Sequence, residues 1–199
     1  MRILVTGGTG FIGRPLCAAL AAAGHELVVL SRNPGSVKAQ CGEHALPLGA
    51  LSDWWEDLRI DAVINLAGEP IMKSRWTEQR KEQLRSSRVA LTEELVRCIA
   101  RARYKPSVLL SGSAIGIYGD CGDQRLDDAS VPAKDFLGGL CFAWEEAALS
   151  ARDNGVRVCL LRTGLVLHPS GGLLGVVLPK FRRGLGGHLG SGNQWMSWI

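Results

Sequence analysis

Tyrosine is scarce in this sequence, and long apolar runs are absent. Of the 199 residues only two are tyrosines, Tyr104 and Tyr118, whereas 46% are hydrophobic. That apolar fraction excludes an intrinsically disordered chain, and the length suits one globular domain of ordinary size. The longest wholly apolar run, residues 16–23, is far shorter than the roughly 20 residues that cross a bilayer as a helix. The sequence therefore predicts no membrane span.

A secretion signal and a framework of disulfides or metal ligands are also missing. Residues 14–23 approach a signal-peptide core, but Arg14 and Pro15 interrupt it, and cleavage there would remove the glycine-rich segment described below. The six cysteines include no Cys-x-x-Cys pair, and the four histidines lack the spacing of a zinc site. We therefore expect a reduced, cytoplasmic protein without a bound metal.

The formal net charge is only +4, and basic residues gather in two segments. Residues 73–105 carry ten Lys and Arg against four acids. This is the usual composition of a solvated helix face, and without interleaved aromatic residues it does not predict nucleic-acid binding. Residues 171–199 contain Lys180, Arg182 and Arg183 and no acid. These cations are either contacts for an anionic small-molecule substrate or a solvated tail.

Short apolar runs alternate with helical stretches along most of the chain. The runs at 3–5, 27–30, 62–66, 108–110 and 156–161 are typical of buried strands, and helices are predicted at 11–23, 77–103 and 137–153. This alternation predicts an α/β protein of the Rossmann type, with a doubly wound parallel sheet covered by helices on both faces.

The texture of the sequence changes after His168, where eight glycines punctuate the remaining residues and no capping element precedes Trp198 and Ile199. We therefore expect no domain boundary within residues 1–165, and an ending that a longer protein would complete.

A glycine-rich motif follows the first predicted strand and opens the first predicted helix. Residues 7–13 fit both G-x-x-G-x-x-G and, from Gly8, G-x-G-x-x-G. Glycine allows the tight turn and lets the backbone approach a diphosphate, whose charge lies at the helix N-terminus. The surrounding strand, helix and second strand make this a dinucleotide-binding signal and not an ordinary turn.

The end of the second predicted strand selects the cofactor. A fold that prefers NAD places Asp or Glu there to bind the ribose 2′-hydroxyl, whereas this chain has Ser31 and Arg32, and no carboxylate follows Glu26 before Glu43. A guanidinium and a hydroxyl suit a 2′-phosphate. The sequence thus predicts NADP(H), with a solvated surface arginine as the alternative for Arg32.

Several further motifs stand along the chain: residues 6–13, Asn65 to Ile71, Arg75-Trp76, Ser111-Gly112-Ser113, Tyr118-Gly119, Trp144 to Glu146, Leu161 to Gly164, 184–187 and 190–192. Together they resemble the extended short-chain dehydrogenase/reductase superfamily, and more narrowly its "epimerase family" branch of atypical nucleoside-diphosphate-sugar epimerase-like proteins. The resemblance spans the whole chain. It implies that residues 1–165 form an NADP-binding Rossmann domain and that residues 166–199 begin a substrate-binding lobe whose C-terminal part is absent.

The resemblance also implies which residues meet the cofactor. Thr9 to Ile12 would wrap the diphosphate, and Ser31 with Arg32 would bind the 2′-phosphate. Leu66 and Ala67 would lie along the adenine-ribose side. The full expected set is Gly7, Thr9, Gly10, Phe11, Ile12, Gly13, Ser31, Arg32, Leu66, Ala67, Gly68, Arg88 and Ser111.

The proton donor is the problem in this sequence. The superfamily uses a Tyr-x-x-x-Lys pair, in which the lysine helps the phenol to act near neutral pH, but residues 136–145 contain neither Tyr nor Lys. Candidate catalytic residues are Ser113, with Ser111 as the alternative for its position, Tyr118 and Glu69. A structural role is the rival interpretation of Tyr118, and a capping or surface carboxylate is that of Glu69.

Adjacent helical residues point about 100° apart, so Glu145 and Glu146 do not form a carboxylate pair and are expected on the helix surface.

Taken together, the sequence predicts an NADP(H)-binding, epimerase-like or reductase-like protein. Hydride transfer would act on a nucleotide sugar or a small carbonyl compound. The alternative is a non-catalytic NADP(H)-sensing or regulatory protein. The sequence does not disclose the oligomeric state.

Overall fold

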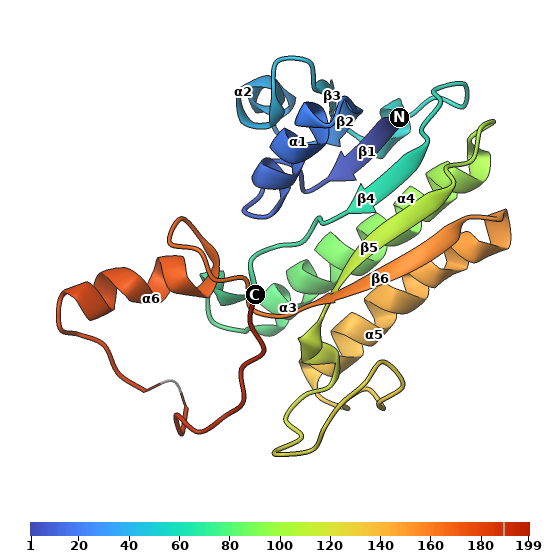
Figure 1. The fold of residues 1–199 in the computed structure, drawn as a ribbon. Coiled ribbons are helices and arrows are strands. Elements are labelled where there is room, and N and C mark those ends of the chain that lie inside the picture. The colour runs from blue at the N-terminus through green and yellow to red at the C-terminus, as the bar shows by residue number, and fades with distance from the viewer. Residues whose placement is uncertain (189) are drawn as a thin grey trace. The chain divides into compact units, whose positions relative to one another are not determined.

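The computed structural model describes residues 1–188 and 190–199, and its centre is a six-stranded sheet in the order β3-β2-β1-β4-β5-β6 (Figure 1). The β1–β2, β1–β4, β2–β3 and β4–β5 pairings are all parallel. The strand order therefore reverses between β1 and β4. The strands are β1 (Arg2–Thr6), β2 (Glu26–Leu30), β3 (Leu46–Leu48), β4 (Ala62–Asn65), β5 (Val108–Ala114) and β6 (Arg157–Thr163).

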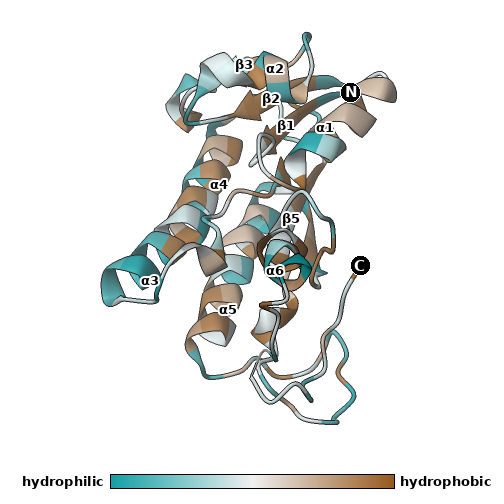
Figure 2. Ribbon diagram, turned by 90° about the vertical axis from the view of Figure 1, so that its left-hand side faces the viewer, coloured by the Kyte–Doolittle hydropathy of each residue, from teal (hydrophilic) through white to brown (hydrophobic). Residues whose placement is uncertain are grey.

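Six α-helices connect or follow these strands in the described residues. They are α1 (Gly13–Ala22), α2 (Val37–Cys41), α3 (Glu78–Arg85), α4 (Leu91–Arg101), α5 (Phe136–Leu149) and α6 (Gly172–Arg182). A π-helical turn, η4 (Ser86–Ala90), joins α3 to α4. The helix predicted at 77–103 is thus present as three consecutive segments, and α3 is largely teal, or hydrophilic, in Figure 2.

Both faces of the sheet are buried. Successive side chains of a strand point to opposite faces, and consecutive residues of β1 belong to two different core clusters. Ile3 and Val5 of β1 pack with Cys17 of α1, whereas Leu4 belongs to a second cluster with Ile99 of α4. In Figure 2, β1 and β2 are coloured mainly as hydrophobic. The predicted Rossmann-type, doubly wound architecture is confirmed by this topology and by the structural similarity reported below.

The chain divides into two compact units that are each discontinuous in sequence. The first contains residues 1–112 and 142–161, and the second contains residues 113–141 and 162–199. Within the second unit, isolated bridges join Leu165 to Trp198 and His168 to Gly171. The predicted division at residue 165 concerns cofactor and substrate binding, which these units do not test, and it stays a prediction.

Three structured segments were not predicted from the sequence. They are the short edge strand β3, the short helix α2 and, in the glycine-rich C-terminal region, the helix α6. The prediction that Glu145 lies on the helix surface is wrong, since this residue is only 5% exposed. Its side of α5 faces the interior, next to the buried Trp144 and Ala148, while Glu146 is exposed.

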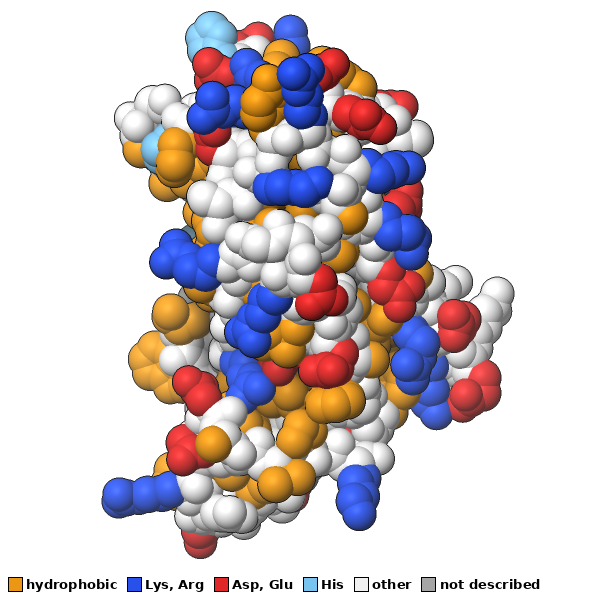
Figure 3. All heavy atoms as spheres, turned by 90° about the vertical axis from the view of Figure 1, so that its right-hand side faces the viewer, with side chains coloured by type: hydrophobic (Ala, Val, Ile, Leu, Met, Phe, Trp, Pro, Cys, Tyr) orange, Lys and Arg blue, Asp and Glu red, His pale blue; other side chains and the backbone are white. Residues whose placement is uncertain are grey.

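Within residues 1–188 and 190–199, no helix is both long and apolar enough to cross a bilayer. The same residues contain no group of three or more His, Cys, Asp and Glu side chains arranged to hold a metal ion. On the face shown in Figure 3, acidic and basic side chains are interspersed, as on an ordinary solvated surface.

Cys17 provides a test of the core beneath α1. Burial, with a smaller contribution from the neighbouring Cys41, raises the pKa of its thiol to about 12. In native protein below pH 9 we expect a maleimide to label the half-buried Cys121 and Cys159 well before Cys17 and Cys41, as read by peptide mass spectrometry. Early labelling of Cys17 would contradict this packing.

The same raised pKa makes stability depend on pH. Below pH 9 the Cys17 thiol is protonated in both the folded and the unfolded chain, so its ionisation has no effect. Between pH 9 and about pH 12 only the unfolded chain ionises, and the free energy of unfolding therefore falls as the pH rises.

Candidate functional site

The glycine-rich segment forms a tight turn between β1 and α1. Gly7 adopts a φ of +70°, a left-handed conformation that glycine tolerates best. A Cβ atom at Gly7 would lie 2.6 Å from the carbonyl oxygen of Leu66. The backbone leaving β1 therefore passes directly against the backbone leaving β4, which only a residue without a side chain permits.

Gly13 has the same requirement at the start of α1. A Cβ atom there would collide with the carbonyl oxygen of Gly7 and would lie 2.6 Å from the Cα of Gly8. The turn is closed by a hydrogen bond of 2.9 Å from the Gly10 N–H to the Gly7 carbonyl. These glycines thus let the first turn of α1 approach the end of β1.

The N-terminus of α1 is left open to an anion. Its N-cap residue is Ile12, which makes no side-chain capping hydrogen bond, and no acidic residue lies in the first turn. The backbone N–H groups and the helix dipole therefore present positive potential that no carboxylate in this first turn compensates. Together with the glycine cradle, this arrangement fits the diphosphate of a dinucleotide.

A buried hydrogen-bond network joins the carboxyl ends of β1, β4 and β5. The Thr6 hydroxyl donates to Asn65 Oδ1 at 2.6 Å. Asn65 Nδ2 donates to the hydroxyls of Thr92 at 2.8 Å and of Ser111 at 3.3 Å. The Ala67 N–H donates to the Thr6 hydroxyl at 3.1 Å. The network fixes the backbone of residues 65–67, where the adenine-ribose side was predicted.

Ser31 and Arg32 follow β2, as predicted, but their side chains behave differently. The Ser31 hydroxyl is buried and exchanges hydrogen bonds with the backbone N–H and carbonyl of Asn33. The Arg32 side chain is 92% exposed, and its Nη1 lies 2.8 Å from Oε1 of Glu69. The structure therefore brings Arg32 and Glu69, which the sequence placed in different roles, into one ion pair.

Glu69 also meets Arg80, a residue that the sequence analysis did not single out. The Arg80 side chain is 8% exposed, its Nη1 lies 3.5 Å from Glu69 Oε2, and its Nη2 donates to the Pro70 carbonyl at 2.5 Å. Thr77 caps α3 and accepts a hydrogen bond from the Arg80 N–H. A Thr followed by Glu and Gln marks the helix start in the sequence, but nothing local reveals that Arg80 turns inward.

Arg88 is packed against the loop that follows β4. Its Nη2 donates to the Glu69 carbonyl at 3.0 Å, and its guanidinium lies 5.4 Å from the centre of the Trp144 ring. A Cβ atom at Gly68 would be 2.8 Å from Arg88 Cζ, so the glycine makes room for this contact. Trp144 donates through Nε1 to the Thr92 hydroxyl at 3.0 Å, which ties it to the buried network.

The candidate catalytic residues Ser113 and Tyr118 belong to the second unit. Ser113 is buried near the carboxyl end of β5. The Tyr118 phenolic oxygen accepts a hydrogen bond of 2.9 Å from Arg162 Nη1, and the same guanidinium lies 5.3 Å from the centre of its ring. Arg162 Nη1 also donates to the Asp128 carbonyl. Tyr118 therefore has a cation beside its oxygen, supplied by a residue far away in sequence.

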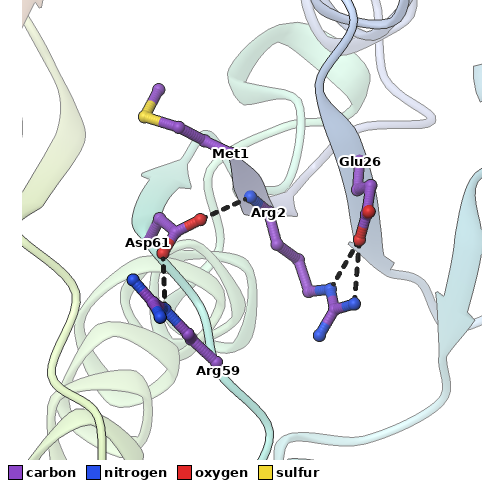
Figure 4. A pocket seen from close by; sticks show the side chains of 5 residues that line it. All are labelled: Met1, Arg2, Glu26, Arg59 and Asp61. Atoms are coloured by element: carbon purple, nitrogen blue, oxygen red, sulfur yellow. Dashed lines mark hydrogen bonds and ion pairs between the residues drawn. The ribbon is translucent and has the colours of Figure 1, made fainter.

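A hollow of about 260 Å³ lies at the amino ends of β1 and β2 (Figure 4). Its charged groups satisfy one another: Arg2 pairs with Glu26, and Arg59 pairs with Asp61. A hydrogen bond from the Arg2 backbone N–H lowers the pKa of Asp61. Because ligands of such sheets bind beyond the carboxyl ends of the strands, we interpret this hollow as a structural tie.

The model of the NAD dependent epimerase/dehydratase family matches residues 3–199. The chain belongs to this family. The predicted membership is thus confirmed, and it agrees with a reversal of strand order between β1 and β4 beside the glycine cradle.

Within the epimerase/dehydratase family, named relatives align with nearly all of this chain. It is 39% identical over 205 residues to the chloroplastic epimerase family protein SDR39U1 homolog of Arabidopsis thaliana, covering 100% of this chain and 58% of the relative. It is 37% identical over 202 residues to epimerase family protein YfhF of Bacillus subtilis, covering 100% and 66%. The chain thus spans about three fifths of the length of such relatives.

Solved structures of the family superimpose well. Human epimerase family protein SDR39U1, crystallised with NADPH, gives a TM-score of 0.84 at 34% identity and covers 100% of this chain and 65% of its own. The nucleoside-diphosphate sugar epimerase from Corynebacterium glutamicum gives a TM-score of 0.80 at 34% identity, with coverage of 100% and 41%. The ligand of the human protein agrees with the cofactor predicted from Arg32.

The glycine cradle can be tested by stability. Replacing Gly13 by Ala would force a Cβ atom into the Gly7 and Gly8 backbone, and we expect a loss of about 1–3 kcal/mol in the free energy of unfolding, measured by urea titration. The control is Gly139→Ala in α5, where a Cβ atom meets nothing within 4 Å. There the change should stabilise the helix by about 0.5–1 kcal/mol. Equal effects at both sites would refute the cradle.

Proposed function

We propose that this chain binds NADP(H) and serves as an epimerase-like or reductase-like protein. The observation that carries the proposal is Arg32, an exposed guanidinium at the end of β2 where NAD-selective folds have a carboxylate. The glycine cradle beside it and the NADPH complex of the 34% identical human relative support the same cofactor.

Each part of the cofactor has a proposed set of contacts in the first unit. The N–H groups at the start of α1 hold the diphosphate, and the loop after β4 lines the adenine-ribose side. Arg32 and Ser31 bind the 2′-phosphate. The Ser31 hydroxyl already bonds the Asn33 backbone, so Ser31 serves mainly by shaping the turn on which Arg32 stands. The remaining proposed contacts are Gly7, Thr9, Gly10, Phe11, Ile12, Gly13, Leu66, Ala67, Gly68, Arg88 and Ser111.

When bound, the nicotinamide ring would supply the group that accepts or donates hydride. The proton on a substrate hydroxyl then needs a partner from the protein. We propose Tyr118 for this role and Ser113 for orienting the substrate oxygen. The Arg162 guanidinium donates a hydrogen bond of 2.9 Å to the Tyr118 oxygen, and it is the cation beside this phenol in a chain that lacks the Tyr-x-x-x-Lys pair. Glu69, held by two arginines, suits a positioning role better than proton transfer.

The second candidate function is a non-catalytic NADP(H) sensor. The specific observation in its favour is the absence of both Tyr and Lys from residues 136–145, where the superfamily's pair is expected. A sensor needs the cofactor site alone, so both candidates predict the same binding behaviour and differ only in turnover. A small, anionic substrate, the absence of nucleic-acid binding and a cytoplasmic location stay predictions.

Cofactor choice is tested by Arg32→Met. We expect the Kd for NADPH to rise by about 10- to 100-fold, because a charge-assisted contact to phosphate worth about 1.5–3 kcal/mol is lost. The Kd for NADH, which has no 2′-phosphate, should change less than about twofold on the same principle. Isothermal titration calorimetry measures both. Arg85→Met, on the exposed surface of α3, is the control and should leave both values unchanged. Equal loss of both cofactors would reject Arg32 as the phosphate contact.

Turnover separates the two candidate functions. NADPH oxidation is followed at 340 nm with a panel of nucleotide sugars and small carbonyl compounds. If the protein is an enzyme, Tyr118→Phe should lower kcat by about 10²- to 10⁴-fold with little change in NADPH affinity. Tyr104→Phe, at the only other tyrosine and exposed, is the matched control. Tight NADPH binding without turnover of any compound would favour the sensor.

A further inference from the structure

The Arg32–Glu69 ion pair crosses the sheet above the end of β1. Thr6, the last residue of β1, is in register with Leu30 of β2 on one side and with Asn65 of β4 on the other. Neighbouring strands are about 4.8 Å apart, so β2 and β4 are separated by roughly 10 Å. Arg32 and Glu69 leave these two strands and meet at 2.8 Å. They therefore bridge the two walls of the crevice in which such folds bind the nucleotide.

The two partners of this pair are held very differently. The Glu69 side chain is 16% exposed, and its second oxygen faces the buried Arg80. Its backbone is fixed as well, because its N–H donates to the Ser87 hydroxyl at 3.1 Å and its carbonyl accepts from Arg88 at 3.0 Å. Arg32 is 92% exposed and offers one nitrogen to one oxygen. Glu69 is thus the fixed partner and Arg32 the movable one.

We infer that Glu69 is a specificity-determining residue, whose carboxylate competes with the 2′-phosphate of NADPH for Arg32. The inference rests on the proposed function, in which Arg32 contacts that phosphate. Without cofactor, Arg32 is paired with Glu69. On binding of NADPH, Arg32 exchanges the carboxylate for the phosphate, so part of the new interaction replaces an old one.

The direction of this exchange follows from charge. A phosphate monoester carries about −1.5 to −2 at neutral pH and three acceptor oxygens, against one negative charge on Glu69. The guanidinium fork matches phosphate oxygens in a bidentate manner, whereas its contact with Glu69 uses a single nitrogen. Glu69 keeps Arg80 when Arg32 leaves. The exchange therefore leaves no unpaired carboxylate behind.

NADH has no group that draws Arg32 away from Glu69. The affinity for NADH should therefore depend little on the charge of Glu69. The affinity for NADPH, by contrast, is lower than it would be if Arg32 were not paired with Glu69. Ion pairs as exposed as this one are weak, and losing one changes an equilibrium by a factor of up to about five. Removing the repulsion between carboxylate and phosphate adds to this factor. We expect a total gain of about three- to tenfold in NADPH affinity when Glu69 is neutralised.

The test uses Glu69→Gln, which keeps the size of the side chain and removes its charge. By isothermal titration calorimetry, the Kd for NADPH should fall about three- to tenfold, and the Kd for NADH should change less than about twofold. Glu82→Gln, an exposed residue of α3, removes the same charge without touching Arg32 and should leave both values unchanged. An unchanged or raised Kd for NADPH in Glu69→Gln would overturn the inference.

A double variant separates this inference from the proposed function. In an Arg32→Met background, Glu69→Gln should no longer improve NADPH binding, because the competed group is gone. If Arg32→Met alone leaves NADPH affinity intact, the proposed phosphate contact fails. If Arg32→Met weakens NADPH binding but the single variant Glu69→Gln does not strengthen it, the phosphate contact stands and only the competition is rejected. A gain that persists in the double variant would also reject competition.

Arg80 is buried against Glu69, so Glu69→Gln leaves this arginine without its carboxylate partner. A second variant, which keeps the negative charge, guards against a loss of folding. Glu69→Asp retains a carboxylate for Arg80 but shortens the side chain by one methylene, which draws the oxygen away from the exposed Arg32. Thermal melts show which variant is folded, and in the folded one NADPH affinity should rise in the same direction. A folded Glu69→Asp protein with weakened NADPH binding would contradict the inference.

Discussion

The buried hydrogen bond between Thr6 and Asn65 is the interaction on which the cofactor side of this molecule depends. It joins the last residues of β1 and β4 at the point where the strand order reverses, and it is 2.6 Å long. Both side chains are fully buried, so loss of either partner would leave a polar group without water, at a cost of about 1–3 kcal/mol. The two loops that diverge from this point carry the glycine cradle and Glu69.

Much of the fold could be predicted from the sequence, because five of the six strands are short apolar runs between helical stretches. The exception is β3, Leu46–Leu48, an edge strand in which Pro47 interrupts the pattern and Leu46 is exposed. Helix α6 was missed because glycines and Pro179 oppose helix formation locally. Glycine spacing between a strand and a helix, by contrast, marked the phosphate cradle because backbone conformation there is a local property.

Side-chain partners were predicted less well than positions. Arg32 and Glu69 were each recognised, yet 37 residues separate them, and their ion pair depends on two strands flanking β1. Arg80 and Arg162 gave no local signal, since a buried arginine and a surface arginine look alike in a sequence. Tertiary contact decides their roles: one supports a carboxylate, and the other lies beside a phenol.

The π-helical turn at Ser86–Ala90 sets the phase between α3 and α4. A π-turn accommodates one residue more than a regular helix, and each residue rotates a helix by about 100°. Without that extra residue, Arg80 on α3 would turn away from Glu69 while Thr92 on α4 kept its place beneath Asn65. The π-helical turn therefore allows two contacts from one continuous helical segment. Arg80 contacts Glu69 in the loop after β4, and Thr92 accepts a hydrogen bond from the buried Asn65. Deleting one residue within Ser86–Ala90 would therefore rotate α3 against α4 by about 100°.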